Sequence, residues 1–188
     1  ILLQGKEHLF SLPLTKASQN RKINEIAVNI DDKWRTKFLR SIEAGYKKAP
    51  QFELVIPMLE RILNKQSTNL ADFIASSFDQ INAHLGLRTP LVVASQQYPS
   101  SGLKGADRIV EICSLAEAKI YINPIGGRGL YSADRFMESD LQLRFIAALP
   151  WKYGQRGIDF VPNLSIIDVL MNVSPQGMQE GLLQYELI

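Results

Sequence analysis

Cysteine and histidine are scarce in this sequence, which has one cysteine and two histidines among 188 residues. A single thiol excludes an internal disulfide and fits a reducing cytoplasm. Cys113 falls on the apolar side of a helical pattern, between Ile109 and Ala116. This position predicts a small buried side chain, because a reactive thiol needs an accessible and electropositive setting. Neither His8 nor His84 has a partner at metal-ligand spacing, so we expect no metal site.

A charge excess and a long apolar run are also missing. The 21 Lys and Arg residues nearly balance the 19 Asp and Glu residues, which gives no indication of nucleic-acid binding. No apolar run approaches the roughly 20 residues that cross a bilayer, and we see no signal peptide. The first residues do not include Met and suggest that an upstream segment is missing. We expect a cytoplasmic protein with one domain over residues 1–188.

The first half of the chain predicts a small antiparallel sheet and then a layer of helices. Residues 7–14 and 23–30 alternate apolar and polar side chains, which is the period of half-buried strands. The polar loop 15–20 between them offers Lys16 and Asn20 as candidate ligand contacts. Three helices follow with no strand between them, so they predict a helical layer.

These three helices have recognisable ends. Asp31 and Asp32 are good caps for the first helix, Pro57 is expected in the first turn of the second, and Asn69 and Gly86 bound the third. The first helix has an apolar stripe of Trp34, Phe38, Ile42 and Tyr46. Its other side carries Lys33, Arg35, Lys37 and Arg40, with Lys47 and Lys48 at the end. Solvation and compensation of the helix dipole explain this basic side, and a phosphate-binding face is the alternative.

From residue 89 onward the pattern changes to alternating strands and helices. Strands are expected at 90–95, 119–123 and 141–147, and helices at 106–116, 132–137, 164–173 and from Ser174 onward. The first two strands and the helix between them predict a βαβ unit with parallel strands. We therefore expect a mixed α/β fold in which a mainly parallel sheet is flanked by helices, with a helical layer from the first half.

The stretch 121–131, YINPIGGRGLY, connects a predicted strand to a glycine-rich turn. Asn123 and Pro124 set the turn, and Arg128 offers a planar fork of donors for a phosphate or carboxylate. Positive φ angles, or close approach of the backbone to a ligand, are expected at Gly126, Gly127 and Gly129. The spacing matches neither G-x-G-x-x-G nor a P-loop, and an ordinary surface turn is the alternative.

A second loop, residues 100–105, joins a predicted strand to a helix N-terminus. Its backbone N–H groups, the helix dipole and Lys104 suit an anion. Many loops of this kind bind nothing, so both interpretations stay open.

Ser165 and Asp168 are the polar residues of an otherwise apolar helix, LSIIDVLM. In one interpretation they form a capping-box-like helix start. In the other, a helix this apolar is buried, so Asp168 must face a partner or a pocket. Tyr153 and Gln155 lie just upstream, with Arg156 and Trp151, in a cluster that favours ligand contact. We expect one crevice at the C-terminal edge of the sheet, lined by Asn123, Arg128, Tyr131, Tyr153, Gln155 and Asp168, with Lys104 at its rim.

Several of these motifs together resemble the WbqC-like family. They are the glycine-rich turn, the Y-x-Q of Tyr153 and Gln155, FVPNLSIIDVLM at 160–171, the terminal YEL, and the segments 46–50, 69–73 and 104–113. The resemblance covers essentially the whole chain. Members of the family also carry an N-terminal strand and a Q-P-x-x-x-P-x-x-G-Y-like stretch, which we expect to be absent from this chain.

The resemblance implies work in O-antigen and other surface-polysaccharide biosynthesis, on nucleotide-activated sugars or on acyl groups attached to amino sugars. We hypothesise a transferase that uses an acyl or aminoacyl donor. Arg128 and Lys104 would hold phosphates, Asp168 would be the base or orient the amine, and Tyr153 or Tyr131 would donate to an oxyanion. The remaining substrate-binding candidates are Asn123, Gly126, Gly127, Gln155, Ser165, Lys16 and Asn20. The alternative is a non-catalytic component that binds a ligand or polysaccharide-biosynthesis enzymes.

Overall fold

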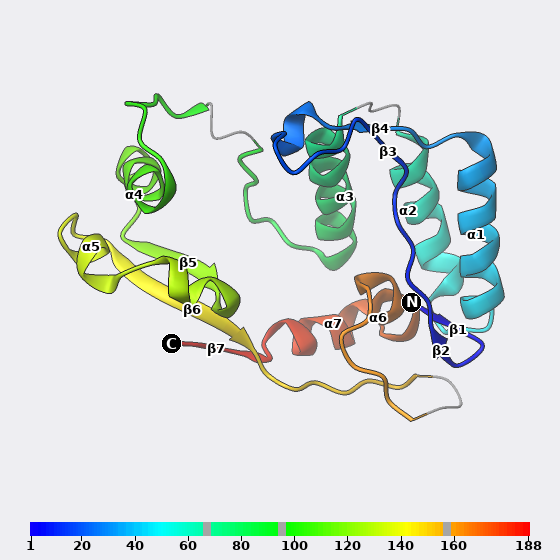
Figure 1. Ribbon diagram of the computed structural model, residues 1–188. Helices are drawn as coiled ribbons and strands as arrows, with labels where there is room; N and C mark the ends of the chain where they lie inside the picture. Colours follow the sequence, from blue (N-terminus) through cyan, green and yellow to red (C-terminus); the bar gives the residue numbers. More distant parts are fainter. Residues whose placement is uncertain (66–68, 94–96, 156–158) are drawn as a thin grey trace. The chain divides into compact units, whose positions relative to one another are not determined.

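The chain passes between two compact units in the computed structural model, which describes residues 1–65, 69–93, 97–155 and 159–188. The helical unit comprises Ile1–Val93 and Lys152–Gly181, and the sheet unit comprises Ala94–Trp151 and Leu182–Ile188 (Figure 1). The single domain expected over residues 1–188 stays a prediction.

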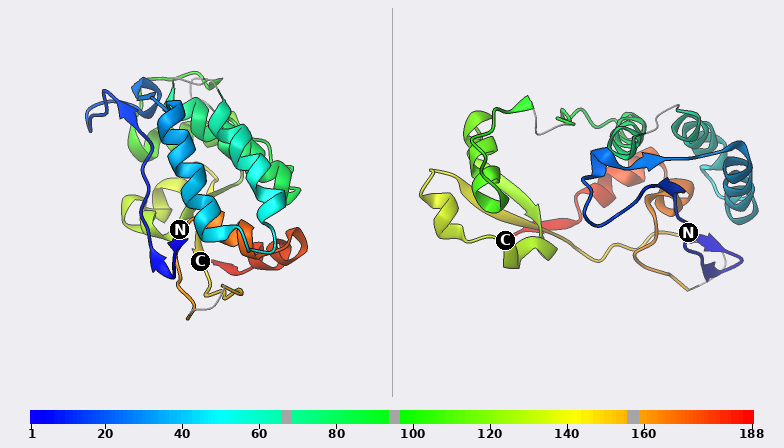
Figure 2. Two further views of the ribbon diagram at one scale, coloured as in Figure 1. Left: turned by 90° about the vertical axis from the view of Figure 1, so that its right-hand side faces the viewer. Right: turned by 45° about the horizontal axis from the view of Figure 1, so that its top comes forward.

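Among the described residues, five α-helices build the helical unit: α1 (Asp32–Tyr46), α2 (Phe52–Asn64), α3 (Leu70–Leu85), α6 (Ile166–Asn172) and α7 (Pro175–Leu182). The first three lie side by side (Figures 1 and 2). Their predicted caps are confirmed. Asp31 accepts a hydrogen bond from the Trp34 N–H at 2.7 Å, and Asn69 accepts from the first turn of α3. Gly86 ends α3 with a left-handed φ of 69°, which favours glycine.

The second helix starts earlier than the sequence predicts. Pro57 lies inside α2 rather than in its first turn. Proline removes the bond that its nitrogen would donate to the carbonyl of Glu53. The helix persists because one of its sides is buried, through Val55, Met58, Leu59, Ile62 and Leu63.

The predicted N-terminal strands are much shorter in the structure. β1 (Leu2–Leu3) pairs antiparallel with β2 (Lys6–Glu7), and β3 (Leu14–Thr15) pairs antiparallel with β4 (Ala27–Val28). Residues 8–13 form no strand, and a short 3-10 helix, η1 (Ile23–Glu25), replaces the start of the second predicted strand. No described strand pairs with residues 8–13, and His8 is exposed there.

The sheet unit holds one mixed sheet of three strands. β6 (Gln142–Ala148) lies in the centre, parallel to β5 (Ile120–Pro124) and antiparallel to β7 (Tyr185–Leu187). The unit also contains α4 (Gly105–Leu115), η3 (Ile125–Leu130) and α5 (Ala133–Met137). Its core includes Val110, Cys113, Phe136 and Leu141, so the prediction that Cys113 is buried is confirmed. Burial raises the pKa of its thiol.

The mixed α/β class is confirmed, but the strand expected at 90–95 is wrong over 90–93, and residues 94 and 95 lie outside the described residues. Leu91, Val92 and Val93 are 45–50% exposed. The βαβ unit expected from 90 to 123 is therefore not formed, and the parallel pair is β5 and β6, joined through η3 and α5. A β-branched run forms a strand only where a neighbouring strand pairs with it. Within the part of the chain that the structure describes, no helix is both long and apolar enough to span a membrane.

Candidate functional site

Asp168 is the one buried charged side chain among the described residues, with none of its surface exposed. It lies in α6, whose neighbouring residues Ile167, Leu170 and Met171 are buried with it. Ser165 caps this helix by accepting from the Ile167 N–H at 3.3 Å, as the capping interpretation predicts. The Asp168 side chain does not join the cap, and its carboxylate lies in the interior of the helical unit.

Three neutral groups donate hydrogen bonds to the Asp168 carboxylate. The Tyr46 hydroxyl donates to Oδ1 at 2.7 Å, and the Tyr153 hydroxyl donates to Oδ2 at 2.7 Å. Gln155 Nε2 also donates to Oδ2 at 3.0 Å. These contacts join two separate segments of the chain, the end of α1 and the stretch 153–155, to the carboxylate of α6. The structure therefore brings together Tyr153, Gln155 and Asp168, three of the predicted site residues.

The donors are themselves held in place. Tyr46 accepts a hydrogen bond from the Leu2 N–H at 2.8 Å, which leaves its proton for Asp168. The Gln155 amide exchanges two hydrogen bonds with the backbone of Val161, at 2.9 and 2.7 Å. Such second contacts fix the rotamers of the donors, so the carboxylate has a defined orientation.

Burial, supported by the hydrogen bond to Asp168, raises the pKa of both Tyr46 and Tyr153 well above the ordinary value for tyrosine. Both hydroxyls therefore keep their protons at neutral pH and act as donors. An ionised carboxylate offers about four acceptor positions, and the described contacts use three of them.

Asp168 borders a pocket of about 210 Å³. The turn of the β1–β2 hairpin, the end of α1 and α6 form its walls. Gly45 allows the hairpin to approach α1, because a Cβ atom there would lie 2.7 Å from the Leu2 carbonyl oxygen. The lining residues are Leu2, Gln4, Gly5, Ala44, Gly45, Tyr46, Ala49, Gln155, Asp168 and Asn172. A small polar group of a ligand fits such a pocket.

Sequence reasoning missed Tyr46 and Asn172 as members of this site. Asn172 Nδ2 donates to the Asp168 carbonyl at 2.8 Å and also lines the pocket. A signal for Tyr46 was present, because it is the one residue of its apolar stripe with a hydroxyl, and a buried hydroxyl needs a partner. Lys16 and Asn20 are exposed and are not among the residues that line the Asp168 pocket.

The glycine-rich turn folds as the 3-10 helix η3, and its polar groups contact the protein itself. Asn123 Nδ2 donates to the Tyr121 hydroxyl at 2.7 Å. Gly126, Gly127 and Gly129 all lack positive φ, while the alternative of a close backbone approach to a ligand stays a prediction. A Cβ atom on Gly127 would lie 2.2 Å from Asn123 Oδ1, whereas Gly126 and Gly129 face open space. The close approach at Gly127 is therefore to a side chain of the same unit.

Two other predicted residues of the sheet unit differ in their exposure. Tyr131 packs edge-on against Tyr121 and Phe136, with ring centroids 5.8 Å apart in each case. Arg128 is exposed on η3, and no described residue bonds to its guanidinium. Arg128 is thus available to an anion, while Tyr131 is part of an aromatic cluster.

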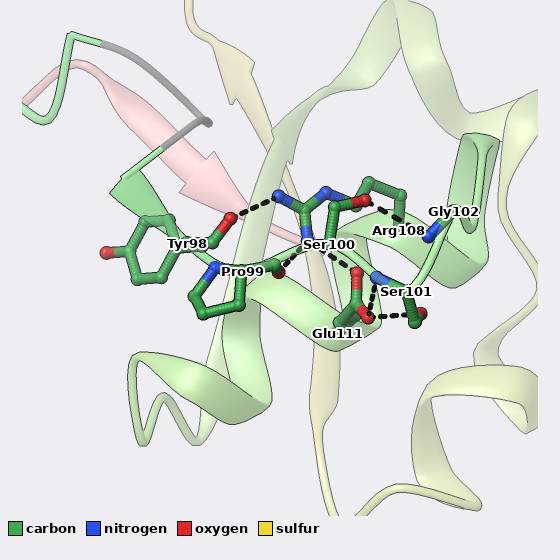
Figure 3. A network of polar contacts seen from close by, with 7 residues as sticks. All are labelled: Tyr98, Pro99, Ser100, Ser101, Gly102, Arg108 and Glu111. Atoms are coloured by element: carbon green, nitrogen blue, oxygen red, sulfur yellow. Dashed lines mark hydrogen bonds and ion pairs between the residues drawn. The ribbon is translucent and has the colours of Figure 1, made fainter.

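The loop before α4 is hydrogen-bonded to an anionic side chain of α4 itself, Glu111, as Figure 3 shows. Ser101 donates its N–H to Glu111 Oε1 at 3.1 Å and its hydroxyl to the same oxygen. Arg108 pairs with Glu111 and also donates to the carbonyls of Tyr98 and Pro99, at 3.0 and 2.7 Å. Hydrogen bonds from Ser101, and then Arg108, hold the pKa of Glu111 below its ordinary value. The Ser101 donors expected to hold an external anion are thus occupied, although Lys104 remains exposed.

The expected single crevice stays a prediction, because its residues divide between the two units. Tyr153, Gln155 and Asp168 belong to the helical unit. Lys104, Asn123, Arg128 and Tyr131 belong to the sheet unit.

Together these features define a mixed α/β protein with an Asp–Tyr–Tyr–Gln cluster, centred on the buried Asp168, beside a small pocket. The chain belongs to the WbqC-like protein family, whose model matches residues 1–180. No curated protein and no solved structure matches it.

Proposed function

We propose that this protein is a cytoplasmic transferase of surface-polysaccharide (O-antigen) biosynthesis. It transfers a small acyl or aminoacyl group to the amine of a nucleotide-linked amino sugar. Membership of the WbqC-like family supports the setting. The observation that carries the proposal is Asp168, a fully buried carboxylate that has three fixed donors and borders a pocket.

In this proposal the sugar amine enters the pocket and donates a further hydrogen bond to the Asp168 carboxylate. The amine nitrogen then attacks the carbonyl carbon of the donor, so that a C–N bond forms. Asp168 takes the proton that the nitrogen loses, and the bond from the carbonyl to the leaving group breaks. The leaving group finally takes up the proton, which returns Asp168 to its carboxylate form.

The surrounding residues have separate roles in this scheme. Tyr153 directs its proton at Asp168, so we assign it to positioning the carboxylate together with Tyr46 and Gln155. The oxyanion role expected for Tyr131 stays a prediction. The phosphate contacts expected for Arg128 and Lys104 also stay predictions, supported by the exposure of both cations.

One observation favours the alternative, a non-catalytic ligand-binding or scaffold component. All described partners of the Asp168 side chain are neutral groups of the protein, as in a polar network that only stabilises the interior. In that case the pocket binds a ligand without turnover.

The test uses the full chain, a panel of nucleotide-linked amino sugars and a panel of acyl and aminoacyl donors, with the N-acylated product detected by mass spectrometry. Asp168→Asn keeps the shape of the side chain but cannot take up the proton. We expect it to lower turnover by at least about 100-fold, in line with the loss of a general base.

Asp140→Asn is the matched control, because Asp140 is an exposed acid that pairs with Lys119. It should leave turnover unchanged. Binding of a nucleotide sugar without turnover with any donor would support the scaffold alternative, and full activity of a folded Asp168→Asn variant would refute the catalytic role.

A further inference from the structure

A groove of about 890 Å³ runs along the outer side of α1. This helix faces the viewer in the left view of Figure 2, with the β1–β2 hairpin beside its C-terminal end. The lining residues are Leu3, Gln4, Asp32, Lys33, Thr36, Lys37, Arg40, Ser41 and Ala44. The volume lies within the range of about 300–1,000 Å³ that small-molecule sites occupy.

Three cations form a row in this groove. Lys33, Lys37 and Arg40 are spaced by four and three residues, so they share one side of the helix and extend over about 10 Å along it. No described residue bonds to the side-chain nitrogens of these three residues. The one acid that lines the groove, Asp32, is paired with Arg35. The row is therefore a set of like charges with which no anion among the described residues pairs.

Compensation of the helix dipole does not explain this row. Asp31 is the N-cap, so Lys33 lies in the first turn of α1, where the dipole disfavours a positive charge. Lys37 and Arg40 lie in the middle of the helix. Lys47 and Lys48, which follow the last turn, fit the dipole explanation, and Lys47 pairs with Glu43.

The row leads to the Asp168 pocket. Ala44 continues the spacing of Lys33, Lys37 and Arg40 by four residues, on the same side of α1. Gln4 and Ala44 line both the groove and the pocket that contains Asp168. A ligand in the groove can therefore place its end group beside the Asp168 carboxylate.

We propose that the groove binds the diphosphate of the nucleotide-linked substrate, with the phosphates along Lys33, Lys37 and Arg40. A diphosphate matches a row of cations better than a single carboxylate does, and a basic row beside apolar side-chain stems also suits the attached nucleoside. This inference rests on the proposed function and names its phosphate site. The groove then supplies phosphate contacts from the unit that holds Asp168, whereas Arg128 and Lys104 belong to the sheet unit.

The test is calorimetric titration of the full chain with uridine diphosphate and with inorganic pyrophosphate at low salt. Lys37→Gln/Arg40→Gln removes two charges from the row. We expect this double variant to weaken both ligands by at least tenfold, and added salt to weaken binding to the native chain. Lys47→Gln/Lys48→Gln is the matched control, since it removes two charges beyond the end of the same helix, and it should change affinity less than twofold.

The outcomes separate this inference from the proposed function. Uridine diphosphate binding that is lost in Lys37→Gln/Arg40→Gln and kept in Asp168→Asn supports the groove, even if no donor yields turnover. Equal affinity in the native and double-variant chains overturns the groove alone, even where turnover depends on Asp168. Absence of binding to the native chain overturns it too. Binding to phosphatidylglycerol vesicles is measured beside these titrations. If Lys37→Gln/Arg40→Gln weakens vesicle binding and leaves uridine diphosphate binding unchanged, the row binds a lipid surface and the inference is overturned.

Discussion

The two units use their polar residues in different ways. In the helical unit, three donors converge on one buried carboxylate that still borders a pocket. In the sheet unit, the groups that resemble a ligand site contact one another, as Asn123 does with Tyr121 and Ser101 with Glu111. Glycine-rich turns are common for packing reasons alone, whereas a buried charge is costly and needs a reason. The buried charge is therefore the better indicator of function here.

Removing the carboxylate should produce the largest effect on stability. Asp168→Ala leaves the hydroxyls of Tyr46 and Tyr153 and the Gln155 amide without their acceptor. We expect a loss of about 3 kcal/mol or more in the free energy of unfolding, because each unsatisfied buried donor costs about 1–3 kcal/mol. Urea unfolding measures this loss. Glu60→Ala, at an exposed acid in the middle of α2, should cost no more than about 0.5 kcal/mol. Similar losses in both variants would contradict the account.

The tyrosines of the two units should contribute differently to the loss of stability at alkaline pH. The folded-state pKa values of Tyr46 and Tyr153 are raised, so above pH about 10 the unfolded chain loses these protons first. Stability is therefore full below that pH and falls above it, by up to about 1.4 kcal/mol for each tyrosine at pH 11. Tyr46→Phe/Tyr153→Phe should flatten the fall measured by urea unfolding between pH 9 and 11.

Tyr121→Phe is the comparison from the sheet unit, where burial also raises the pKa. We expect it to flatten the fall less than the double variant does. An unchanged slope in Tyr46→Phe/Tyr153→Phe would show that these hydroxyls do not control the alkaline limit.

Two glycine substitutions compare close packing in the two units. A Cβ atom at Gly45 would press on the Leu2 backbone, whereas one at Gly127 would press on the movable Asn123 side chain. We expect Gly45→Ala to cost about 1–3 kcal/mol of unfolding free energy, because overpacking against backbone is difficult to relieve. Gly127→Ala should cost less, and Asn123→Ala should relieve it. Thermal unfolding measures both, and a larger cost at Gly127 would contradict the packing described.

The smallest effect is expected at the loop before α4. Ser101→Ala removes the hydroxyl that Glu111 accepts but leaves the Ser101 N–H in place. A loss of about 1 kcal/mol or less is expected, since one hydrogen bond near the surface is removed. Chemical denaturation checks this value. A gain in stability would mean that the hydrogen bond from the Ser101 hydroxyl to Glu111 holds the loop in a strained conformation.

Local signals predicted much of the helical unit. The caps Asp31, Asn69 and Gly86 act through hydrogen bonds within a few residues, so the sequence alone reveals them. The strand expected at 90–95 was wrong over 90–93 because a strand depends on a pairing partner, which the β-branched run itself does not specify.

The candidate site was predicted only in part, for a similar reason. Tyr153, Gln155 and Asp168 lie within 16 positions in the sequence, and the apolar helix indicates that its acid is buried. The contact between Tyr46 and Asp168 joins residues 122 positions apart. No short motif specifies such a contact, so Tyr46 was interpreted as a member of an apolar stripe.

The most direct test of the account asks whether Asp168 holds the amine of a substrate. Calorimetry on the native chain and on Asp168→Asn would compare UDP-glucosamine with UDP-N-acetylglucosamine, in which the amine is blocked. The account predicts that the native chain prefers the free amine by about tenfold or more, as expected for a hydrogen bond to a charged group, and that this preference disappears in Asp168→Asn. Equal preference in both proteins would contradict it.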